Sequence, residues 1–186
     1  MNLIEVFRKE VYKPLGDILK EEGDGGFIKK GPDIVFSFFK KHPQKLYSLK
    51  SKYAEEGYTR KKVICDDGLH AVRCMEWCPN AVSPIHEHGG RPCFDIVLEG
   101  ELDIVDYSPN REGNLFRLVE KKRYSVSVGD FVKVDPFKGG EIHEVINGRV
   151  RSRSLHFYPI DHRSLGLYKR RKDGLFEYDT CDVPND

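Results

Sequence analysis

The sequence has little that would point to a membrane, an export route or a nucleic acid. Its 186 residues contain no apolar run near the ~20 residues of a membrane-spanning helix. The 31 basic and 30 acidic side chains give a formal net charge of +1, and the basic clusters are dispersed, so we expect no nucleic-acid partner. The first residues lack the charged and apolar regions of a signal peptide. We therefore expect a cytoplasmic protein that does not bind membranes.

Cysteine is sparse and its spacing forms no recognisable pair. The five cysteines are Cys65, Cys74, Cys78, Cys93 and Cys181. The count is odd and no C-x-x-C pair occurs, which argues against a disulfide framework and against a thiolate zinc site. A reducing compartment follows from this pattern. A chain of this length suits one domain with enough core to be stable alone, and we expect a monomer.

The pattern of apolar residues changes near Gly57. In residues 1–56 apolar side chains recur at roughly helical intervals, with a breaker at residues 21–26 and another short helix expected over residues 43–56. After Gly57, runs of Val, Ile, Phe and Tyr alternate with turn residues, which is typical of short strands. We predict an all-β core, a sandwich or small barrel, over residues 57–161. A helical lead-in (1–56) precedes it and a C-terminal extension (162–186) follows it.

Turn residues separate the predicted strands. Asp67-Gly68 is a strong hairpin signal between two such runs. We expect the other turns or loops at Gly89-Gly90, around Ser108-Pro109-Asn110, at Val128-Gly129-Asp130 and at Gly139-Gly140.

His86, His88 and His143 are the candidate metal ligands. In an extended strand, residues two apart point to the same face, so His86 and His88 aim at one point while Glu87 faces away. His143 lies in a second strand bounded by glycine and could supply a third imidazole. Three neutral imidazoles without a carboxylate leave a divalent metal its full charge and open coordination positions. Iron, zinc and nickel would each accept such ligands.

A second pattern lies between residues 149 and 158. Arg149, Arg151 and Arg153 alternate with another set, Ser154, His156 and Tyr158, on the opposite face. If the arginine face meets solvent, the other three point into the barrel. Buried polar groups need partners, and a hydrogen-bonded line ending at a phenol beside a metal would provide them. The alternative is a polar edge strand.

These histidines stand within two recognisable motifs. The stretch His86-x-His88-x4-Cys93-x6-Gly100 resembles the first cupin motif, with cysteine where most cupins carry glutamate. Gly140-x-x-His143-x3-Asn147 resembles the second. The departures are Asn80 where a glycine usually begins the first motif, Pro136 one place late in the second, and a longer segment between the motifs.

Cys93, in place of the usual glutamate, makes the resemblance more specific than the cupin superfamily as a whole. The chain from Gly57 to Asp161 closely resembles cysteine dioxygenase. The residues that carry the likeness are Tyr58-Thr59-Arg60, Trp77, His86-Glu87-His88, Cys93-Phe94, His143 and Ser154-Leu155-His156-Phe157-Tyr158. The resemblance implies a jelly-roll barrel with iron(II) on the three histidines. It also implies addition of both atoms of O2 to the thiol of L-cysteine, giving cysteine sulfinic acid.

Roles for the remaining residues follow from the resemblance and from side-chain chemistry. The planar fork of Arg60 matches a substrate carboxylate bidentately, and Tyr58 could orient it or simply pack. Tyr158 would donate a hydrogen bond toward thiolate or oxygen, with His156 fixing its hydroxyl and Ser154 supporting His156. In animal members of the family, the matching cysteine and tyrosine are joined by a thioether. We therefore predict that a Cys93–Tyr158 bond can form.

Two alternatives remain at this stage. Arg163 could be a second cation near the pocket, which would favour a mercaptocarboxylate such as 3-mercaptopropionate over cysteine. The second alternative is a cupin that binds metal without catalysis. In each case the partners are small molecules.

Overall fold

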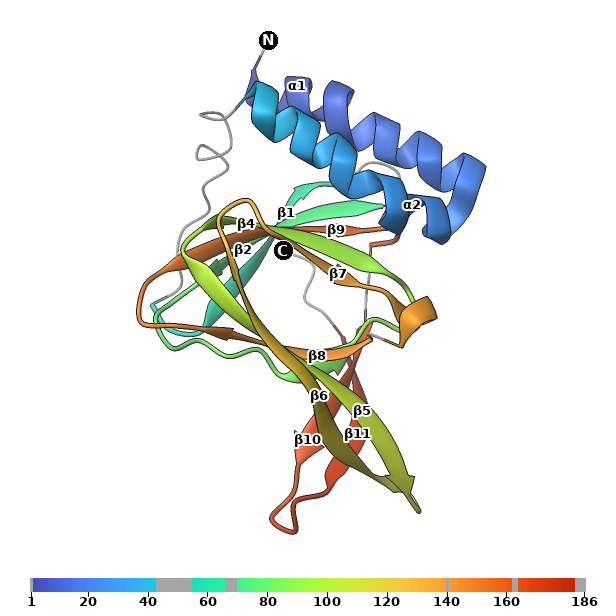
Figure 1. Cartoon of the computed structure of the whole chain (residues 1–186), viewed down its shortest axis with the longest axis vertical. Helices are drawn as coiled ribbons and strands as arrows, with labels where there is room; N and C mark the ends of the chain where they lie inside the picture. Colours follow the sequence, from blue (N-terminus) through green and yellow to red (C-terminus); the bar gives the residue numbers. More distant parts are fainter. Residues whose placement is uncertain (1, 43–54, 66–69, 140, 162–163, 183–186) are drawn as a thin grey trace.

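The computed structural model describes residues 2–42, 55–65, 70–139, 141–161 and 164–182. The helical elements are α1 (Leu3–Phe7), a π-helical turn (Arg8–Tyr12), α2 (Lys13–Lys41) and a 3-10 turn (Pro136–Lys138). The strands are β1 (Tyr58–Ile64), β2 (Ala71–Trp77), β3 (Ile85–Glu87), β4 (Cys93–Glu99), β5 (Glu101–Glu112), β6 (Leu115–Ser127), β7 (Phe131–Val134), β8 (Ile142–Asn147), β9 (Ser152–Tyr158), β10 (Ser164–Arg170) and β11 (Phe176–Asp182). The predicted all-β core with N-terminal helices is therefore confirmed (Figure 1).

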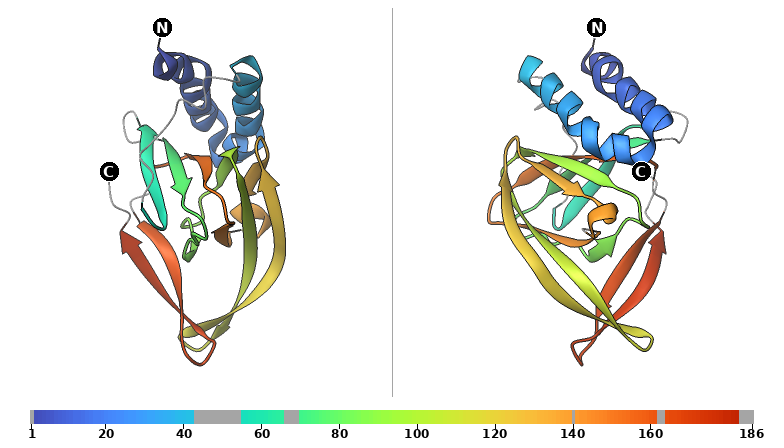
Figure 2. Two further views of the ribbon diagram at one scale, coloured as in Figure 1. Left: turned by 90° about the vertical axis from the view of Figure 1, so that its left-hand side faces the viewer. Right: turned by 45° about the vertical axis from the view of Figure 1, so that its right-hand side comes forward.

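The N-terminal helices form a bent arm over one sheet. The predicted breaker is a sharp kink at Gly23, whose φ of 63° and ψ of −160° suit glycine far better than other residues. Figure 2 shows the two legs of the arm diverging above the strands. Phe27 packs on Phe94 with ring centroids 5.2 Å apart, and Phe7 packs on Phe157 at 6.4 Å. The helix expected over residues 43–56 lies almost entirely outside the described residues.

The covered sheet has the order β1-β2-β9-β4-β7. Alternation along β4 puts Phe94, Ile96 and Leu98 into the core beneath the helices, while Val97 joins a second core between the sheets. Strands β1 and β2 pair antiparallel from Tyr58↔Trp77 onward, as a hairpin requires. The Asp67-Gly68 turn itself lies outside the described residues.

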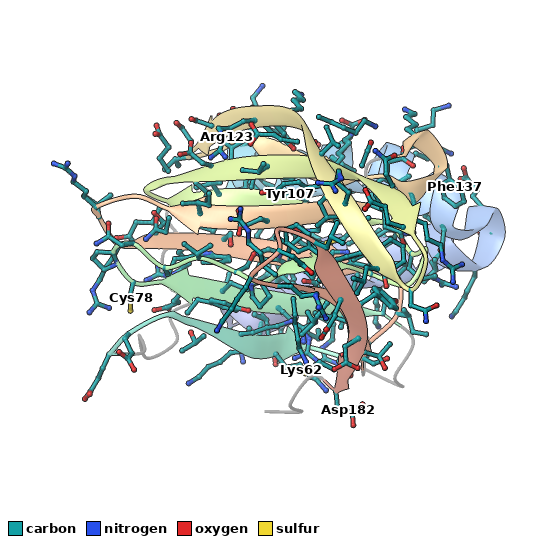
Figure 3. The ribbon with its side chains drawn as sticks, turned by 90° about the horizontal axis from the view of Figure 1, so that it is seen from below. Lys62, Cys78, Tyr107, Arg123, Phe137 and Asp182 are labelled. Atoms are coloured by element: carbon teal, nitrogen blue, oxygen red, sulfur yellow. The ribbon has the colours of Figure 1, made fainter. Side chains whose placement is uncertain are left out.

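The second sheet closes in the order β10-β11-β6-β5-β8-β3. Residues 164–182, expected only as an extension, form a hairpin of this sheet: β10 pairs with β3 through Leu167↔His86, and β11 meets β6 at Phe176↔Phe116. Side chains from both sheets project into the space between them (Figure 3). Within the described residues, none of the helices has the length and apolar character that a membrane crossing requires.

Most predicted turns are present. Gly89 and Gly90 form one turn with φ of 62° and 73°, and Gly129 forms another with φ of 91°. Asn80, which replaces the usual glycine of the first motif, has a φ of 60°, a conformation that asparagine tolerates better than most residues. Gly139 has a positive φ after the 3-10 turn, while Gly140 is outside the described residues.

The loop predicted around Ser108-Pro109-Asn110 is wrong. Strand β5 continues through these residues, and Pro109 pairs with Leu118. Strand β8 covers β5 only from Leu102 to Tyr107, so Pro109 lies where β5 has one neighbour. A proline can occupy such an edge because its missing N–H has no ladder partner to leave unpaired.

The expectation of a solvent-facing arginine row is wrong at Arg153. Arg149 and Arg151 are exposed, but Arg153 is only 2 % exposed. Its guanidinium lies 3.2 Å from Glu76, which is its partner in the β2–β9 register, and 3.3 Å from Glu99. These carboxylates compensate the buried charge, which strand alternation alone does not reveal.

Candidate metal centre

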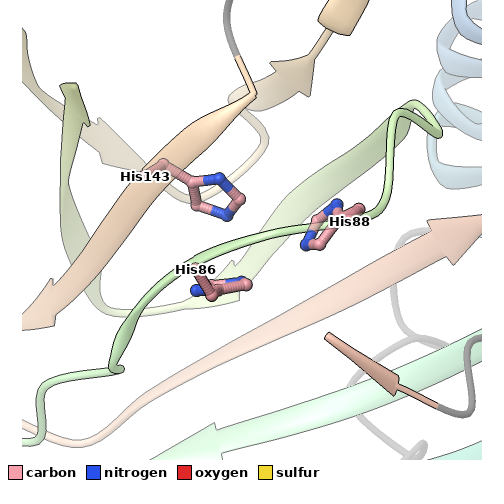
Figure 4. Close-up of side chains that lie close together, drawn as sticks. All are labelled: His86, His88 and His143. Atoms are coloured by element: carbon pink, nitrogen blue, oxygen red, sulfur yellow. The ribbon is translucent and has the colours of Figure 1, made fainter. Parts of the chain in front are cut away.

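Two strands of the second sheet bring the three histidines together. His86 lies on β3 directly opposite His143 on β8, and His88 follows β3 by one residue. The ring centroids lie 4.3 Å apart for His86 and His143, and 5.1 Å apart for each pair that includes His88. One nitrogen of each ring lies within 4.8 Å of the others. Figure 4 shows the rings converging from the two strands.

Backbone carbonyls orient two of the rings. His86 Nδ1 donates to Pro84 O at 2.9 Å, and His143 Nδ1 donates to Glu141 O at 3.1 Å. With Nδ1 carrying the proton, Nε2 keeps its lone pair for a metal. Burial lowers the pKa of His86 well below its usual range, with a further contribution from His143, and burial likewise lowers the pKa of His143. Both rings are thus held neutral, as metal ligation requires.

Glu87 faces away from the histidines, as predicted. Its Oε1 accepts a hydrogen bond from the Tyr178 hydroxyl at 2.7 Å, and its Oε2 accepts one from Gly89 N. Glu141 accepts from Gly90 N. These carboxylates hold the turn after β3, and Glu87 also ties β3 to β11, so they support the histidines without competing as ligands.

A small cavity of about 50 Å³ opens on the histidines. A water molecule takes about 10–15 Å³ on this scale, so the space suits a small substrate. Its lining comprises Tyr58, Arg60, Met75, Trp77, Ser83, Pro84, His86, His88, His143, Val145, His156, Tyr158, Leu165 and Leu167. Among these lining residues no carboxylate occurs, and Arg60 is the one permanent cation. Arg163, the proposed second cation, and its neighbour His162 lie outside the described residues.

Arg60 is placed to receive an anion. Its Cζ lies 5.2 Å from the centroid of the Tyr158 ring. Its Nη1 and Nη2 are buried and, apart from a contact with the Tyr158 hydroxyl, meet no hydrogen-bond partner in the described part of the chain. Buried charged donors without partners are costly, and a ligand carboxylate would satisfy them. Tyr58 stacks on Trp77 at 4.7 Å, so its packing is evident.

Ser154 and His156 belong to a buried hydrogen-bonded line, but the line does not run to Tyr158. Trp77 Nε1 donates to Ser154 Oγ at 2.9 Å, and Ser154 Oγ lies 2.7 Å from His156 Nε2. His156 Nδ1 lies 2.7 Å from Asp95 Oδ1. Both ring nitrogens are therefore engaged, and the predicted bond from His156 to the Tyr158 hydroxyl is wrong. The two rings lie parallel with centroids 6.2 Å apart.

Cys93 and Tyr158 share a small buried cluster with Val134. The β4–β9 register pairs Phe94 with Phe157, so the next position sets Cys93 opposite Tyr158. Burial raises the pKa of Cys93, with a further contribution from Asp95, and burial also raises the pKa of Tyr158 despite the opposing charge of Arg60. Thiol and phenol are thus neutral at physiological pH.

Comparison with protein families matches residues 35–171 to the family described as cysteine dioxygenase type I. The chain belongs to this family. No curated protein matches it significantly. The three histidines of this cysteine dioxygenase family member suit a divalent metal by donor type and separation.

Solved structures resemble this family member only distantly. An oxalate oxidase in complex with glycolate shares 15 % identity at a TM-score of 0.47, covering 60 % of this chain and 56 % of that one. A cupin superfamily protein from Desulfitobacterium hafniense shares 16 % identity at a TM-score of 0.45, covering 62 % of this chain and 88 % of that one. A cupin-2 domain from Rhodospirillum rubrum shares 16 % identity at a TM-score of 0.45, covering 63 % of this chain and 70 % of that one. The chain thus spans little more than half the length of the oxidase.

Asp95 is the site residue that the sequence reading missed. It is 5 % exposed and accepts from His156, while Cys93 Sγ lies 2.9 Å from the same Oδ1. The available signal was its position two residues after Cys93, which puts both side chains on one face of the strand. Its pairing with His156 depends on the β4–β9 register, which no local pattern gives.

Proposed function

We propose that this chain is a thiol dioxygenase that oxidises the thiol of L-cysteine to cysteine sulfinic acid with O2. His86, His88 and His143 would hold iron(II), and the bound ion would activate dioxygen and accept the substrate thiolate. The observation that carries the proposal is the convergence of these histidines on a small cavity in a member of the cysteine dioxygenase family.

The protein's own groups would bind and orient the substrate. Arg60 would hold the carboxylate, since the two terminal nitrogens of its buried guanidinium have no carboxylate partner among the described residues. Tyr158 is placed to donate its hydroxyl proton in a hydrogen bond, because the phenol stays neutral. Positioning of this kind reduces the entropic cost of bringing the reacting groups together.

A second substrate class has support in the same cavity. No carboxylate among the lining residues could pair with the ammonium group of cysteine, whereas Arg60 would bind the carboxylate of either compound. A mercaptocarboxylate such as 3-mercaptopropionate is therefore the second candidate. We also propose that the protein acts as a monomer in the cytoplasm, where thiols stay reduced; none of its five cysteines is in a disulfide.

Oxygen uptake with a small panel of thiols tests the proposal. Purified protein loaded with iron(II) is assayed with L-cysteine, 3-mercaptopropionate and cysteamine, and its metal content is measured in parallel. We expect uptake with L-cysteine and formation of its sulfinic acid. Preference for 3-mercaptopropionate would support the second candidate, and no uptake with any thiol would support a non-catalytic metal-binding role.

A further inference from the structure

The start of β4 carries part of a buried cluster of polar side chains that has no role in the proposed function. Cys93, Asp95 and His156 place a thiol, a carboxylate and an imidazole within 4.8 Å of one another, and each is at most 6 % exposed. Alternation along β4 puts Cys93 and Asp95 on one face, and the β4–β9 register sets Asp95 opposite His156.

The distances within the cluster indicate hydrogen bonds rather than a second metal site. Two ligands on a tetrahedral zinc ion lie about 3.4 Å apart, given metal–ligand distances near 2.0–2.2 Å. In this cluster Asp95 Oδ1 lies 2.7 Å from His156 Nδ1 and 2.9 Å from Cys93 Sγ. Both separations suit a hydrogen bond to a shared oxygen.

Donor and acceptor chemistry fixes the role of Asp95 in the line. The indole of Trp77 can only donate, so Ser154 Oγ accepts that bond, and the same oxygen contacts His156 Nε2. His156 Nδ1 donates to Asp95, because a carboxylate offers only acceptors. Asp95 Oδ1 is therefore the acceptor for both the imidazole and the Cys93 thiol. It is the carboxylate that touches this thiol.

We propose that Asp95 accepts the thiol proton of Cys93 when a thioether bond forms between Cys93 Sγ and the Tyr158 ring. The inference rests on the proposed function, because it needs dioxygen as the oxidant and the metal centre to mediate the oxidation. Cys93 shares a buried cluster with Tyr158, and the strand register sets the two residues opposite each other.

The bond changes balance with one molecule of dioxygen. The S–H bond of Cys93 breaks, as does a ring C–H bond of Tyr158 next to the phenol carbon, and one C–S bond forms. The two electrons and two protons reduce O2 to hydrogen peroxide. Asp95 holds the thiol proton in transit, which lets the sulfur react without a free thiolate forming in a buried site.

The test is the rate of cross-linking in variants of the full chain. Iron(II)-loaded protein is incubated aerobically with L-cysteine, and the loss of two hydrogens is followed by the mass of the Cys93–Tyr158 peptide pair. Asparagine at position 95 keeps the size and the hydrogen-bond acceptor but has no basic carboxylate. We expect Asp95→Asn to slow cross-linking roughly 100-fold or more, the usual contribution of a proton acceptor.

Asp173→Asn is the matched control. It makes the same change of side chain at an exposed ion pair with Arg171, outside the cluster, so we expect cross-linking within about twofold of wild type. Asp95→Glu should retain most of the rate, because the carboxylate is kept. If Asp95→Asn does not fold, Asp95→Ser is the second variant, since the smaller side chain leaves room for a water molecule.

The outcomes separate this inference from the proposed function. Wild-type cross-linking in a folded Asp95→Asn or Asp95→Ser variant would overturn the inference, as would equal losses in Asp95→Asn and Asp173→Asn. Absence of the thioether in wild-type protein that consumes oxygen would also overturn it, while leaving the dioxygenase proposal intact. Absence of oxygen uptake with any thiol would instead remove the proposed function.

Discussion

His86 and His143 lie directly opposite each other on antiparallel strands, with ring centroids 4.3 Å apart. Each donates its Nδ1 proton to a backbone carbonyl two residues earlier in its own chain segment. The pairing of β3 with β8 therefore sets the distance between the two rings, and local backbone sets their tautomers. His88 adds the third nitrogen from the turn that follows β3.

Replacing either paired histidine should abolish stable metal binding. His86→Ala and His143→Ala each leave two imidazoles, and we expect the iron content to fall from about one ion per chain to below about one tenth. Metal analysis after anaerobic loading and desalting measures this. His42→Ala is the control, because His42 pairs with Glu10 on the helical arm, and it should retain full iron.

Removing the cation of the cavity should weaken substrate binding. Arg60→Met keeps a long side chain but loses the donors. We expect kcat/KM for L-cysteine to fall roughly 10- to 150-fold, which corresponds to a loss of about 1.5–3 kcal/mol of binding free energy. Most of the loss should appear in KM. Steady-state oxygen uptake is the measurement.

Lys61→Met serves as the control for Arg60→Met. Lys61 is the exposed neighbour of Arg60 on β1, so its replacement should leave kcat/KM nearly unchanged. Cysteamine has no carboxylate, and any rate with cysteamine should be insensitive to the Arg60 change. A similar loss with both compounds would assign Arg60 to the fold rather than to the substrate.

The Tyr158 hydroxyl should contribute to turnover. Tyr158→Phe removes one hydrogen-bond donor from the cavity. It should lower the rate roughly 5- to 150-fold, which corresponds to a rise of about 1–3 kcal/mol in the activation free energy. Single-turnover oxygen consumption at saturating L-cysteine reports this change. Full activity in the phenylalanine variant would remove Tyr158 from the proposed mechanism.

Asp161 should stabilise the fold through a buried cation. Arg73 is fully buried and lies 2.6 Å from Asp161, and Lys62 lies 2.9 Å from it. Asp161→Asn leaves the Arg73 charge without its carboxylate. We expect the free energy of unfolding at pH 7 to fall by up to about 3 kcal/mol, the low end for a buried pair because Asp161 is 13 % exposed. Urea denaturation measures this difference.

The same pair predicts a pH dependence. Burial alone would raise the pKa of Asp161, but hydrogen bonds from Lys62 and Arg73 outweigh it and lower the pKa below 3.8. A depressed carboxyl pKa stabilises the folded state above the pKa of the unfolded chain, near pH 3.9, and this stabilisation is lost as the pH falls through the folded-state value. The difference in free energy of unfolding between wild type and Asp161→Asn should therefore shrink as the pH is lowered. Asp173→Asn, at an exposed ion pair, should change stability by less than about 0.5 kcal/mol at any pH.

The sequence predicted those parts of the site that depend on local geometry. The two-residue spacing of His86 and His88 gave their common direction, and Gly89-Gly90 gave the turn that follows. The kink at Gly23 and the left-handed Asn80 likewise reflect the conformational tolerance of single residues.

Features that depend on pairing between distant strands were not predicted. Asp95 meets His156, and Arg153 meets Glu76, only because β9 lies between β2 and β4. Residues 164–182 contribute Leu165 and Leu167 to the cavity because β10 pairs with β3. Spacing along the chain does not encode which strands become neighbours, so these contacts required the structure.

Isotope labelling tests the central claim most directly. Iron(II)-loaded protein is given L-cysteine under 18O2, and the product is analysed by mass spectrometry. The account predicts cysteine sulfinic acid with both sulfinate oxygens labelled, and no product from the His143→Ala variant. Formation of disulfide alone, or a sulfinate without label from dioxygen, would contradict it.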